Sequence, residues 1–199
     1  MNRHAKSLLA VAWLAVIPLA AVAEDAPAKG AQLAYTCLGC HGIENYKNSY
    51  PKYSVPKLGG QHKAYIEAAL KEYRDGSRWH PTMHGYASTL SDEDIAELAA
   101  WFSSRASKPA DNIVAGTPPA KASICVACHG QNGFGTMDEY PNLAGQHEDY
   151  LAQALNDYRR GKRKNPIMQP FASQLTPEEI AELAKFFAAQ EGLKTPHQE

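Results

Sequence analysis

Two copies of one short cysteine–histidine motif dominate the chemistry of this chain. Each copy reads C-x-x-C-H, and the residues concerned are Cys37, Cys40, His41, Cys125, Cys128 and His129. This spacing is the attachment signal for a c-type haem, in which two thiols bond one macrocycle and the adjacent histidine ligates its iron. The motifs use all 4 cysteines of the chain. A redox or zinc-binding pair is the alternative for a single copy, but two matching copies favour two covalently bound haem c groups.

The first residues are typical of an export signal. Arg3 and Lys6 give a basic start, residues 7–21 are largely apolar, and residues 21–23 match a small-residue cleavage site. Pro18 interrupts the apolar run, which is short for a membrane span. We interpret residues 1–23 as a signal peptide that is removed, with an uncleaved anchor as the alternative. Because C-x-x-C-H proteins receive haem outside the cytoplasm, we expect the protein in a bacterial periplasm.

An internal repeat predicts two domains. Residues 56–103 align with residues 141–188 at a constant offset of 85 (141 − 56), and roughly half of the aligned positions are identical. A stretch rich in proline, residues 107–119, reads as a linker. We therefore predict an N-terminal domain over 24–106 and a C-terminal domain over 120–199. Domains of this size have thin apolar cores, which a covalent haem would complete.

The apolar periodicity predicts an all-α fold, because no stretch shows convincing strand alternation. Ser91 and Thr176 each precede a stripe of apolar residues at helical spacing, with Asp94 and Glu179 three residues on to close a capping box. The other helices are expected over residues 62–74 and 147–159, and as short segments before the haem motifs over 31–36 and 120–126. The two longer segments are expected to stop near Gly76 and Gly161.

Met83 and Met168 are the candidates for the sixth ligand of the two irons. They occupy equivalent positions of the repeat, each two residues after a proline and shortly before the last helix. A thioether ligand raises the reduction potential of a haem. Met137 competes with Met168 but follows His129 closely, and His84 is the competitor beside Met83. The sequence therefore predicts iron ligation by the histidine of each motif together with these two methionines.

Each half of the chain resembles a small class I cytochrome c. The tandem of two, with a Leu-x-Gly-Gln element at residues 58–61 and 143–146, is similar to the dihaem cytochrome c4 family. This resemblance implies two tandem cytochrome c domains, each wrapped around one covalent haem. The first half departs from the pattern after His41, where residues 43–53 lack the usual glycine-rich turn and contain three tyrosines.

The resemblance also implies supporting roles for repeated residues. Pro56 and Pro141 match prolines whose carbonyl accepts a hydrogen bond from the iron-ligating imidazole. Arg78 and Arg163 recur before the methionine loops, where they either pair with haem propionates or remain solvated. The repeated pairs that could cap the middle helices or contact haem are Gln61, Gln146, His62 and His147. Capping is the interpretation we favour for the two histidines.

The charge pattern excludes little beyond nucleic acid. The chain has 20 basic and 21 acidic residues, a balance that does not favour binding of DNA or RNA. A basic run over residues 159–164 indicates either a solvated face or a patch that steers an acidic partner. Because reduction adds an electron, we expect this run to raise the potential of the second haem.

Two functions from different classes follow from the motifs and the resemblance. The favoured one is an electron carrier, not an enzyme, that links respiratory partners and passes electrons from a quinol-oxidising complex to a terminal oxidase. The alternative is the cytochrome subunit of a periplasmic dehydrogenase, such as a sulfide-oxidising flavocytochrome c with a flavoprotein partner. Neither function assigns a catalytic residue to this chain, and peripheral association with a membrane is compatible with both.

Overall fold

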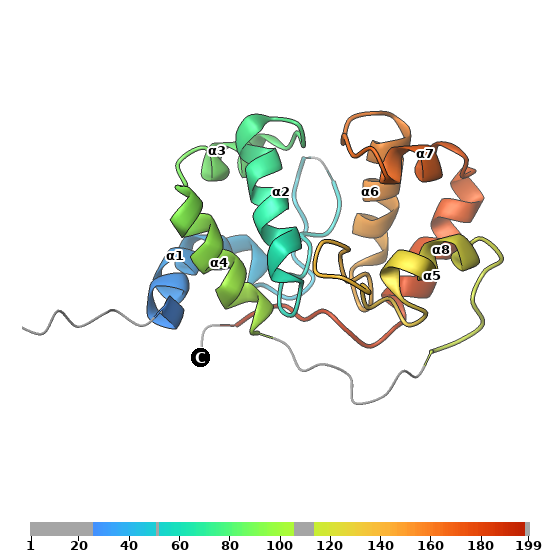
Figure 1. Ribbon diagram of the computed structural model, residues 1–199, viewed down its shortest axis with the longest axis horizontal. Helices are drawn as coiled ribbons and strands as arrows, with labels where there is room; N and C mark the ends of the chain where they lie inside the picture. Colours follow the sequence, from blue (N-terminus) through green and yellow to red (C-terminus); the bar gives the residue numbers. More distant parts are fainter. Residues whose placement is uncertain (1–25, 51, 106–113, 198–199) are drawn as a thin grey trace, which may run out of the picture.

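The computed structural model describes residues 26–50, 52–105 and 114–197, which form two helical lobes side by side (Figure 1). The predicted signal peptide and residues 107–113 of the predicted linker lie outside these ranges. The elements are α1 (Ala26–His41), α2 (Lys63–Asp75), α3 (Pro81–Ala87), α4 (Asp92–Ser103), α5 (Ala122–His129), α6 (Glu148–Arg159), α7 (Met168–Ser173) and α8 (Pro177–Ala188). Extended pairing in these ranges is limited to isolated bridges, so the predicted all-α class is confirmed.

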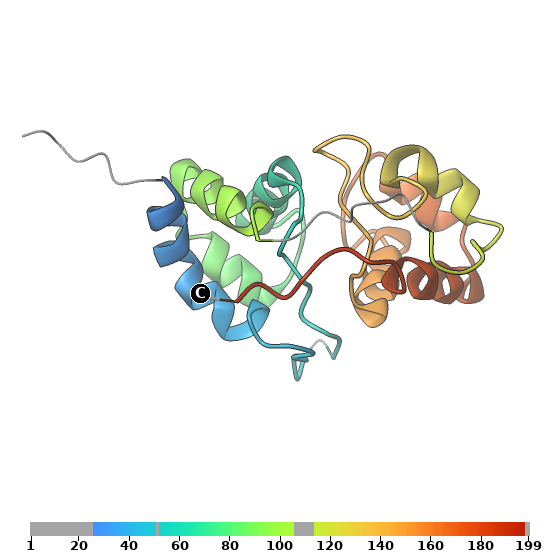
Figure 2. The same ribbon diagram turned by 90° about the horizontal axis from the view of Figure 1, so that it is seen from below.

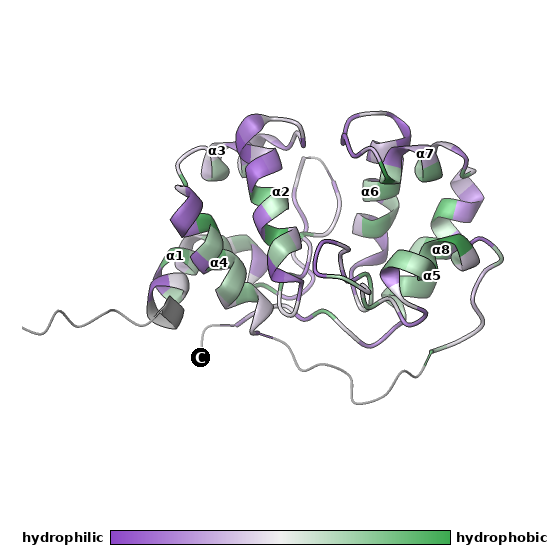
Figure 3. Ribbon diagram, viewed as in Figure 1, coloured by the Kyte–Doolittle hydropathy of each residue, from purple (hydrophilic) through white to green (hydrophobic). Residues whose placement is uncertain are grey.

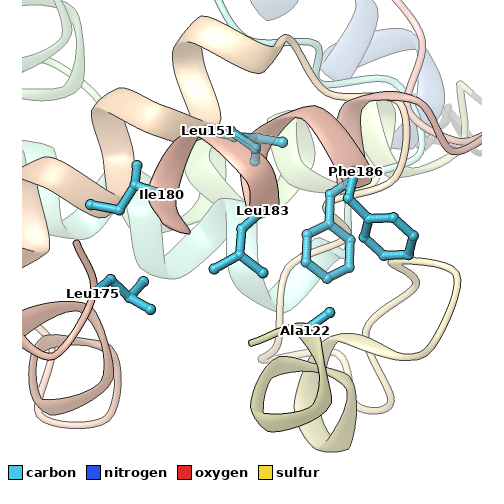
Figure 4. Packing of buried hydrophobic residues seen from close by; sticks show 8 residues of the cluster. Ala122, Leu151, Leu175, Ile180, Leu183 and Phe186 are labelled. Atoms are coloured by element: carbon cyan, nitrogen blue, oxygen red, sulfur yellow. The ribbon is translucent and has the colours of Figure 1, made fainter. Parts of the chain in front are cut away.

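The apolar stripes predicted for the last helix of each half form the two cores. In the first lobe α4 packs against α1 and α2, and Leu98 and Phe102 are almost fully buried. In the second lobe α8 packs against α6, where Leu151, Ile180 and Leu183 converge (Figure 4). Hydrophobic residues gather along these packed faces, whereas the connections around α2 are mostly hydrophilic (Figure 3). Within the described ranges, no helix is both long and apolar enough to cross a bilayer.

The predicted capping boxes of the last helices are present. Ser91 Oγ accepts a hydrogen bond from Asp94 N at 3.1 Å, and Thr176 Oγ1 accepts one from Glu179 N at 3.2 Å. In both helices the acidic side chain also bonds the backbone N–H of the cap residue. Gly76 ends α2 with φ of 81°, the left-handed conformation that the predicted stop requires.

Two local predictions are wrong. The helices expected over residues 31–36 and 120–126 instead run through the haem motifs, to His41 in α1 and to His129 in α5. The spacing explains this, because residues i, i+3 and i+4 share one face of a helix and a helical motif therefore presents both thiols and the imidazole together. His62 and His147 sit at the N-termini of α2 and α6, but their side chains make no capping hydrogen bond.

The lobes are joined by two equivalent glutamine side chains. Gln61 Oε1 accepts a hydrogen bond from Asn142 N at 2.8 Å, and Gln61 Nε2 donates to Asn142 O at 3.0 Å. In the opposite direction, Gln146 Oε1 accepts from Lys57 N at 2.9 Å and Gln146 Nε2 donates to Lys57 O at 3.0 Å. Each glutamine thus holds the backbone of one residue in the other lobe, as a neighbouring strand would. We call this arrangement the glutamine clasp.

Further contacts across the interface follow the same repeat. The side chain of Lys57 donates to Gly145 O at 2.7 Å, and that of Asn142 donates to Gly60 O at 2.9 Å. The C-terminal segment then returns from the second lobe and lies along the first (Figure 2). There Lys194 exchanges two backbone hydrogen bonds of 3.0 Å with Gly59. The interface is therefore built twice from equivalent residues and reinforced by the end of the chain.

The end of the tyrosine-containing stretch of the first half, and the residue that follows it, also contact the second lobe. Ser54 donates to Asp149 Oδ2 from its backbone N–H at 3.1 Å and from its hydroxyl at 2.9 Å. The ring of Tyr53 packs against that of Tyr150, with centroids 6.1 Å apart. This contact has no counterpart on the other side of the interface, because Ala64 occupies the position equivalent to Asp149.

The close crossing of α1 over α4 depends on Gly30. A Cβ added there would lie 2.7 Å from Glu97 O and 2.8 Å from Trp101 Cβ, so we expect Gly30→Ala to destabilise the protein by about 1–3 kcal/mol. Gly39→Ala, in the same helix, meets nothing within 4 Å and matches Ala127 of the second motif, so it should be neutral or stabilising. Chemical denaturation followed by circular dichroism compares them, and equal midpoints would refute the tight crossing.

Candidate functional site

One continuous cavity of about 440 Å³ runs between the lobes and reaches both haem motifs. Its walls include the residues that the sequence singled out: Cys37, Cys40, His41, Met83, Cys125, Cys128, His129 and Met168. The rest of the lining is mainly apolar and comes from helices of both lobes. The structure therefore brings both predicted sets of site residues to one space rather than to two separate pockets.

The motif histidines are buried and oriented by the expected proline carbonyls. His41 Nδ1 lies 2.8 Å from Pro56 O, and His129 Nδ1 lies 2.9 Å from Pro141 O. A carbonyl oxygen only accepts, so Nδ1 carries the proton and Nε2 keeps a free lone pair. Burial outweighs this hydrogen bond and lowers the pKa of both imidazoles. Both rings are thus held in the neutral tautomer that a metal requires.

The four cysteines stand where covalent attachment needs them. Cys37 and Cys40 lie in the last turns of α1, and Cys125 and Cys128 occupy the same places in α5. None of them forms a disulfide. Burial raises the pKa of the Cys37 and Cys125 thiols, which disfavours the reactive thiolate that a redox pair would need. The cysteine arrangement is therefore that of a haem attachment site.

Both candidate methionines lie in the first turn of a short helix, and a polar side chain fixes that turn. The backbone N–H of Met83 donates to His80 Nδ1 at 3.3 Å, and that of Met168 donates to Asn165 Oδ1 at 2.9 Å. His80 and Asn165 are equivalent in the repeat, but their different residue types conceal the shared role in the sequence. The accepting Nδ1 of His80 is unprotonated, which is consistent with burial lowering the pKa of this imidazole.

The competing ligands lie elsewhere. Met137 has half of its surface exposed and is not among the residues that line the cavity. His84 directs Nδ1 to Tyr73 O at 2.8 Å and packs its ring against Trp79. Of the three methionines considered as iron ligands, Met83 and Met168 belong to the cavity wall and Met137 does not.

A symmetric cluster of arginine and tyrosine side chains closes one part of the cavity. Arg78 donates to the Tyr150 hydroxyl at 2.7 Å, and Arg163 donates to the Tyr65 hydroxyl at 2.6 Å. Each guanidinium also lies over a tyrosine of its own lobe. Both arginines are only 6% exposed, which excludes the solvated alternative of the two that the sequence left open.

These two buried cations leave the cavity electrostatically incomplete. Neither forms an ion pair with a carboxylate in the described part of the chain, and Arg163 Nε is buried without an acceptor there. Burial raises the pKa of Tyr65, but Arg163 and Arg78 outweigh burial and lower it to about 8. Such a site favours an anion. The propionates of a haem would supply one, so the residues present fit the group that the motifs imply.

The basic run over residues 159–164 divides into two kinds of side chain. Arg163 lines the cavity, where Arg78 balances it from the other lobe. Arg160, Lys162 and Lys164 are exposed, so water and salt screen their charges. The expected higher potential of the second haem therefore stays a prediction without support from the buried charges, which are matched in the two lobes.

Comparison with known proteins agrees with this geometry. The cytochrome c family model matches residues 27–106 and again residues 120–190. Cytochrome c4 of Pseudomonas aeruginosa is 36% identical over 94% of this chain and 98% of its own length. This chain belongs to the cytochrome c4 family.

Solved structures extend the likeness to the fold. The reduced recombinant cytochrome c4 from Pseudomonas stutzeri matches with a TM-score of 0.64 and 29% identity, over 83% of this chain and 97% of that one. A thiosulfate dehydrogenase from Marichromatium purpuratum matches with a TM-score of 0.67 and 28% identity, over 82% of this chain and 40% of that one. A relative from Stutzerimonas stutzeri, named thiosulfate dehydrogenase electron acceptor, is 31% identical over 78% of this chain and 79% of its own length.

Membership of the family fixes the cofactor and the broad role. Cytochrome c domains bind haem c covalently, and the two cysteine pairs of this chain fit two haems. The protein is a dihaem, electron-carrying c-type cytochrome with redox proteins as its partners. The haem groups supply the iron that is oxidised and reduced, while the protein supplies ligands, orientation and the electrostatic surroundings.

The buried arginines should control potential more than the exposed basic residues do. Arg163→Gln removes a positive charge from the shared cavity, so we expect the potential of at least one haem to fall by on the order of 40 mV, equivalent to about 1 kcal/mol. Lys162→Gln, which changes an exposed charge one residue away, should shift either potential much less. Spectroelectrochemical titration measures both variants, and equal shifts would contradict the assigned role of Arg163.

Proposed function

We propose that this protein is a periplasmic carrier that accepts electrons from a quinol-oxidising complex and delivers them to a terminal oxidase. The observation that carries this proposal is the shared cavity between the lobes, whose lining includes two histidine–methionine sets. Two irons held there would be close enough to share electrons without a substrate between them. Export by a signal peptide over residues 1–23 would place the protein beside both membrane complexes.

We propose iron ligation by His41 and Met83 in the first domain and by His129 and Met168 in the second. The fixed tautomer of each histidine supports this, since Nε2 is the nitrogen left free. The polar caps at Met83 N and Met168 N support it as well, because they hold the methionine turns in place before iron binds. Attachment runs through Cys37, Cys40, Cys125 and Cys128. The domain limits proposed are 24–106 and 120–199.

A carrier with both axial positions filled has no open iron for a substrate. We therefore propose that the chain itself catalyses no conversion of a small molecule. The role of the protein is to bind the two groups, exclude water from them and present their edges to partners. Two exposed aromatic residues at equivalent positions, Tyr86 and Phe171, belong to the cavity wall and offer apolar contact surface at its rim.

A second candidate function is the acceptance of electrons from a periplasmic dehydrogenase. It is favoured by the relative from Stutzerimonas stutzeri that is named thiosulfate dehydrogenase electron acceptor. The structural match to a thiosulfate dehydrogenase favours it too. This chain covers 40% of that protein, so a domain pair of this kind forms part of such an enzyme. A flavocytochrome that oxidises sulfide is the version of this function expected from the sequence. In either version the chain remains a non-catalytic electron acceptor.

The methionine assignment predicts a spectroscopic loss. The oxidised protein should show the weak near-infrared band of sulfur bound to ferric iron, and Met83→Ala or Met168→Ala should each remove about half of it and lower one potential. Met137→Ala is the matched control and should change neither quantity, because that side chain is exposed and outside the cavity wall. Loss of the band in Met137→Ala would overturn the assignment in the second domain.

Rapid mixing distinguishes the two functions. The reduced protein should be oxidised by membranes that contain the terminal oxidase with a second-order rate constant of about 10⁵–10⁷ M⁻¹s⁻¹. Phe171→Ser should slow this step severalfold without a change in potential. Tyr35→Ser is the control and should not slow it, because this aromatic side chain is 69% exposed and lies outside the cavity wall. Slow reaction with oxidase, together with rapid reduction by a thiosulfate dehydrogenase and thiosulfate, would favour the second function.

A further inference from the structure

We propose that each domain tunes the iron of the other domain through the glutamine clasp. The inference rests on the proposed ligation by His41 and His129. It concerns the peptide group that follows each proline whose carbonyl accepts from a motif histidine. These groups are Pro56–Lys57 in the first lobe and Pro141–Asn142 in the second. In both lobes that one planar group is hydrogen-bonded at its two ends to different domains.

In the first lobe the chain of contacts begins at the iron-ligating histidine. His41 Nδ1 donates to Pro56 O at 2.8 Å, and that carbonyl shares its peptide group with the N–H of Lys57. The Lys57 N–H donates to Gln146 Oε1 of the second lobe at 2.9 Å. Two hydrogen bonds and one amide therefore connect the imidazole of one domain to a side chain of the other.

The second lobe repeats this series of hydrogen bonds in the opposite direction. His129 Nδ1 donates to Pro141 O at 2.9 Å, and the N–H of the same peptide group, on Asn142, donates to Gln61 Oε1 at 2.8 Å. Both glutamines are well buried, with exposures of 5% for Gln61 and 4% for Gln146. Water is therefore poorly placed to substitute for either side-chain oxygen.

A peptide group that donates at its N–H becomes a stronger acceptor at its carbonyl, because resonance moves electron density toward oxygen and linked hydrogen bonds polarise one another. A stronger acceptor draws the Nδ1 proton of the histidine and makes the imidazole a more basic ligand. A more basic ligand stabilises ferric iron relative to ferrous iron and so lowers the potential. Each glutamine is thus a positioning residue that holds down the potential of the haem in the opposite lobe.

The glutamine oxygen is itself fixed within its own domain. Gln61 Oε1 also accepts from His62 N, and Gln146 Oε1 from His147 N, both at 3.0 Å. These N–H groups belong to the residues just before α2 and α6, so the oxygen is held at the N-terminus of a helix of its own lobe. A shift of one lobe against the other would therefore alter the N–H···Oε1 contact first. Any partner that changed the interface would alter both potentials through this contact.

The test replaces each glutamine in the holoprotein and measures both potentials at an electrode. Gln146→Leu removes the acceptor for Lys57 N–H, so the equilibrium constant for reduction of the first haem should rise three- to tenfold, about 28–59 mV. The second haem should move less. Gln61→Leu should give the mirror result. Each wave is assigned from the NMR signals of the axial ligands in its own lobe.

Two further variants separate tuning from a loosened interface. Ser54→Ala removes a hydroxyl that bonds Asp149 across the same interface at 2.9 Å without touching either peptide group, so both potentials should stay unchanged. Gln146→Glu keeps an acceptor oxygen for the Lys57 N–H, so it should not raise the first potential. If a Leu variant fails to load haem, Gln→Asn, which withdraws the oxygen by one methylene, should give the same sign.

A direct readout accompanies the potentials. In the reduced protein the Nδ1 proton of His41 should move to lower frequency in Gln146→Leu and stay in place in Gln61→Leu, because only the former weakens its hydrogen bond. The inference is overturned if the haem of the mutated lobe shifts more, if both haems shift equally, if neither shifts, or if Ser54→Ala has the same effect. Absence of the near-infrared band of sulfur-bound ferric iron from the wild-type protein would instead refute the proposed methionine ligation itself.

Discussion

The two peptide groups that follow Pro56 and Pro141 are the points at which the motif histidines and the interface between the lobes are fixed together. Each fixes the imidazole of its own lobe through its carbonyl and bonds the opposite lobe through its N–H. A buried amide with both ends bonded is worth little net free energy, but leaving either end unpaired would cost about 1–3 kcal/mol. One peptide group therefore meets the hydrogen-bonding needs of a histidine and of the interface together, and the repeat provides such a group in each lobe.

The shared cavity explains why two such small domains stay together. Each lobe has a small apolar core built around the stripe of its last helix, and side chains of both lobes line the space between them. Covalent haem would fill this mainly apolar space, and Arg78 and Arg163 would supply positive charge for its propionates. The residues that line the cavity would therefore also bring the two haem groups together.

The sequence was sufficient for features set by local spacing. The capping boxes at Ser91 and Thr176 and the apolar stripe of the last helix follow from contacts within a few residues, and these predictions are confirmed. The extent of the first helix of each lobe was wrong, because the prediction took the motif as a helix end. The i, i+3, i+4 geometry of its ligands in fact continues the helix through it.

Features that depend on the packing of one lobe on the other could not be predicted from the sequence. Gln61 and Gln146 were expected either to cap the middle helices or to contact haem, yet both bond the opposite lobe. His80 and Asn165 share a role that their residue types hide. The repeat did contain a signal for the clasp, since a glutamine recurs in both halves five residues after a recurring proline.

The most direct test of this account is an optical redox titration of the purified, haem-loaded protein. Two covalent haems with histidine and methionine ligands should take up two electrons per chain in two one-electron steps. Both ferric haems should be low-spin, and neither ferrous haem should bind carbon monoxide. Uptake of one electron per chain, or a high-spin haem that binds carbon monoxide, would contradict the assignment of two closed irons in the interdomain cavity.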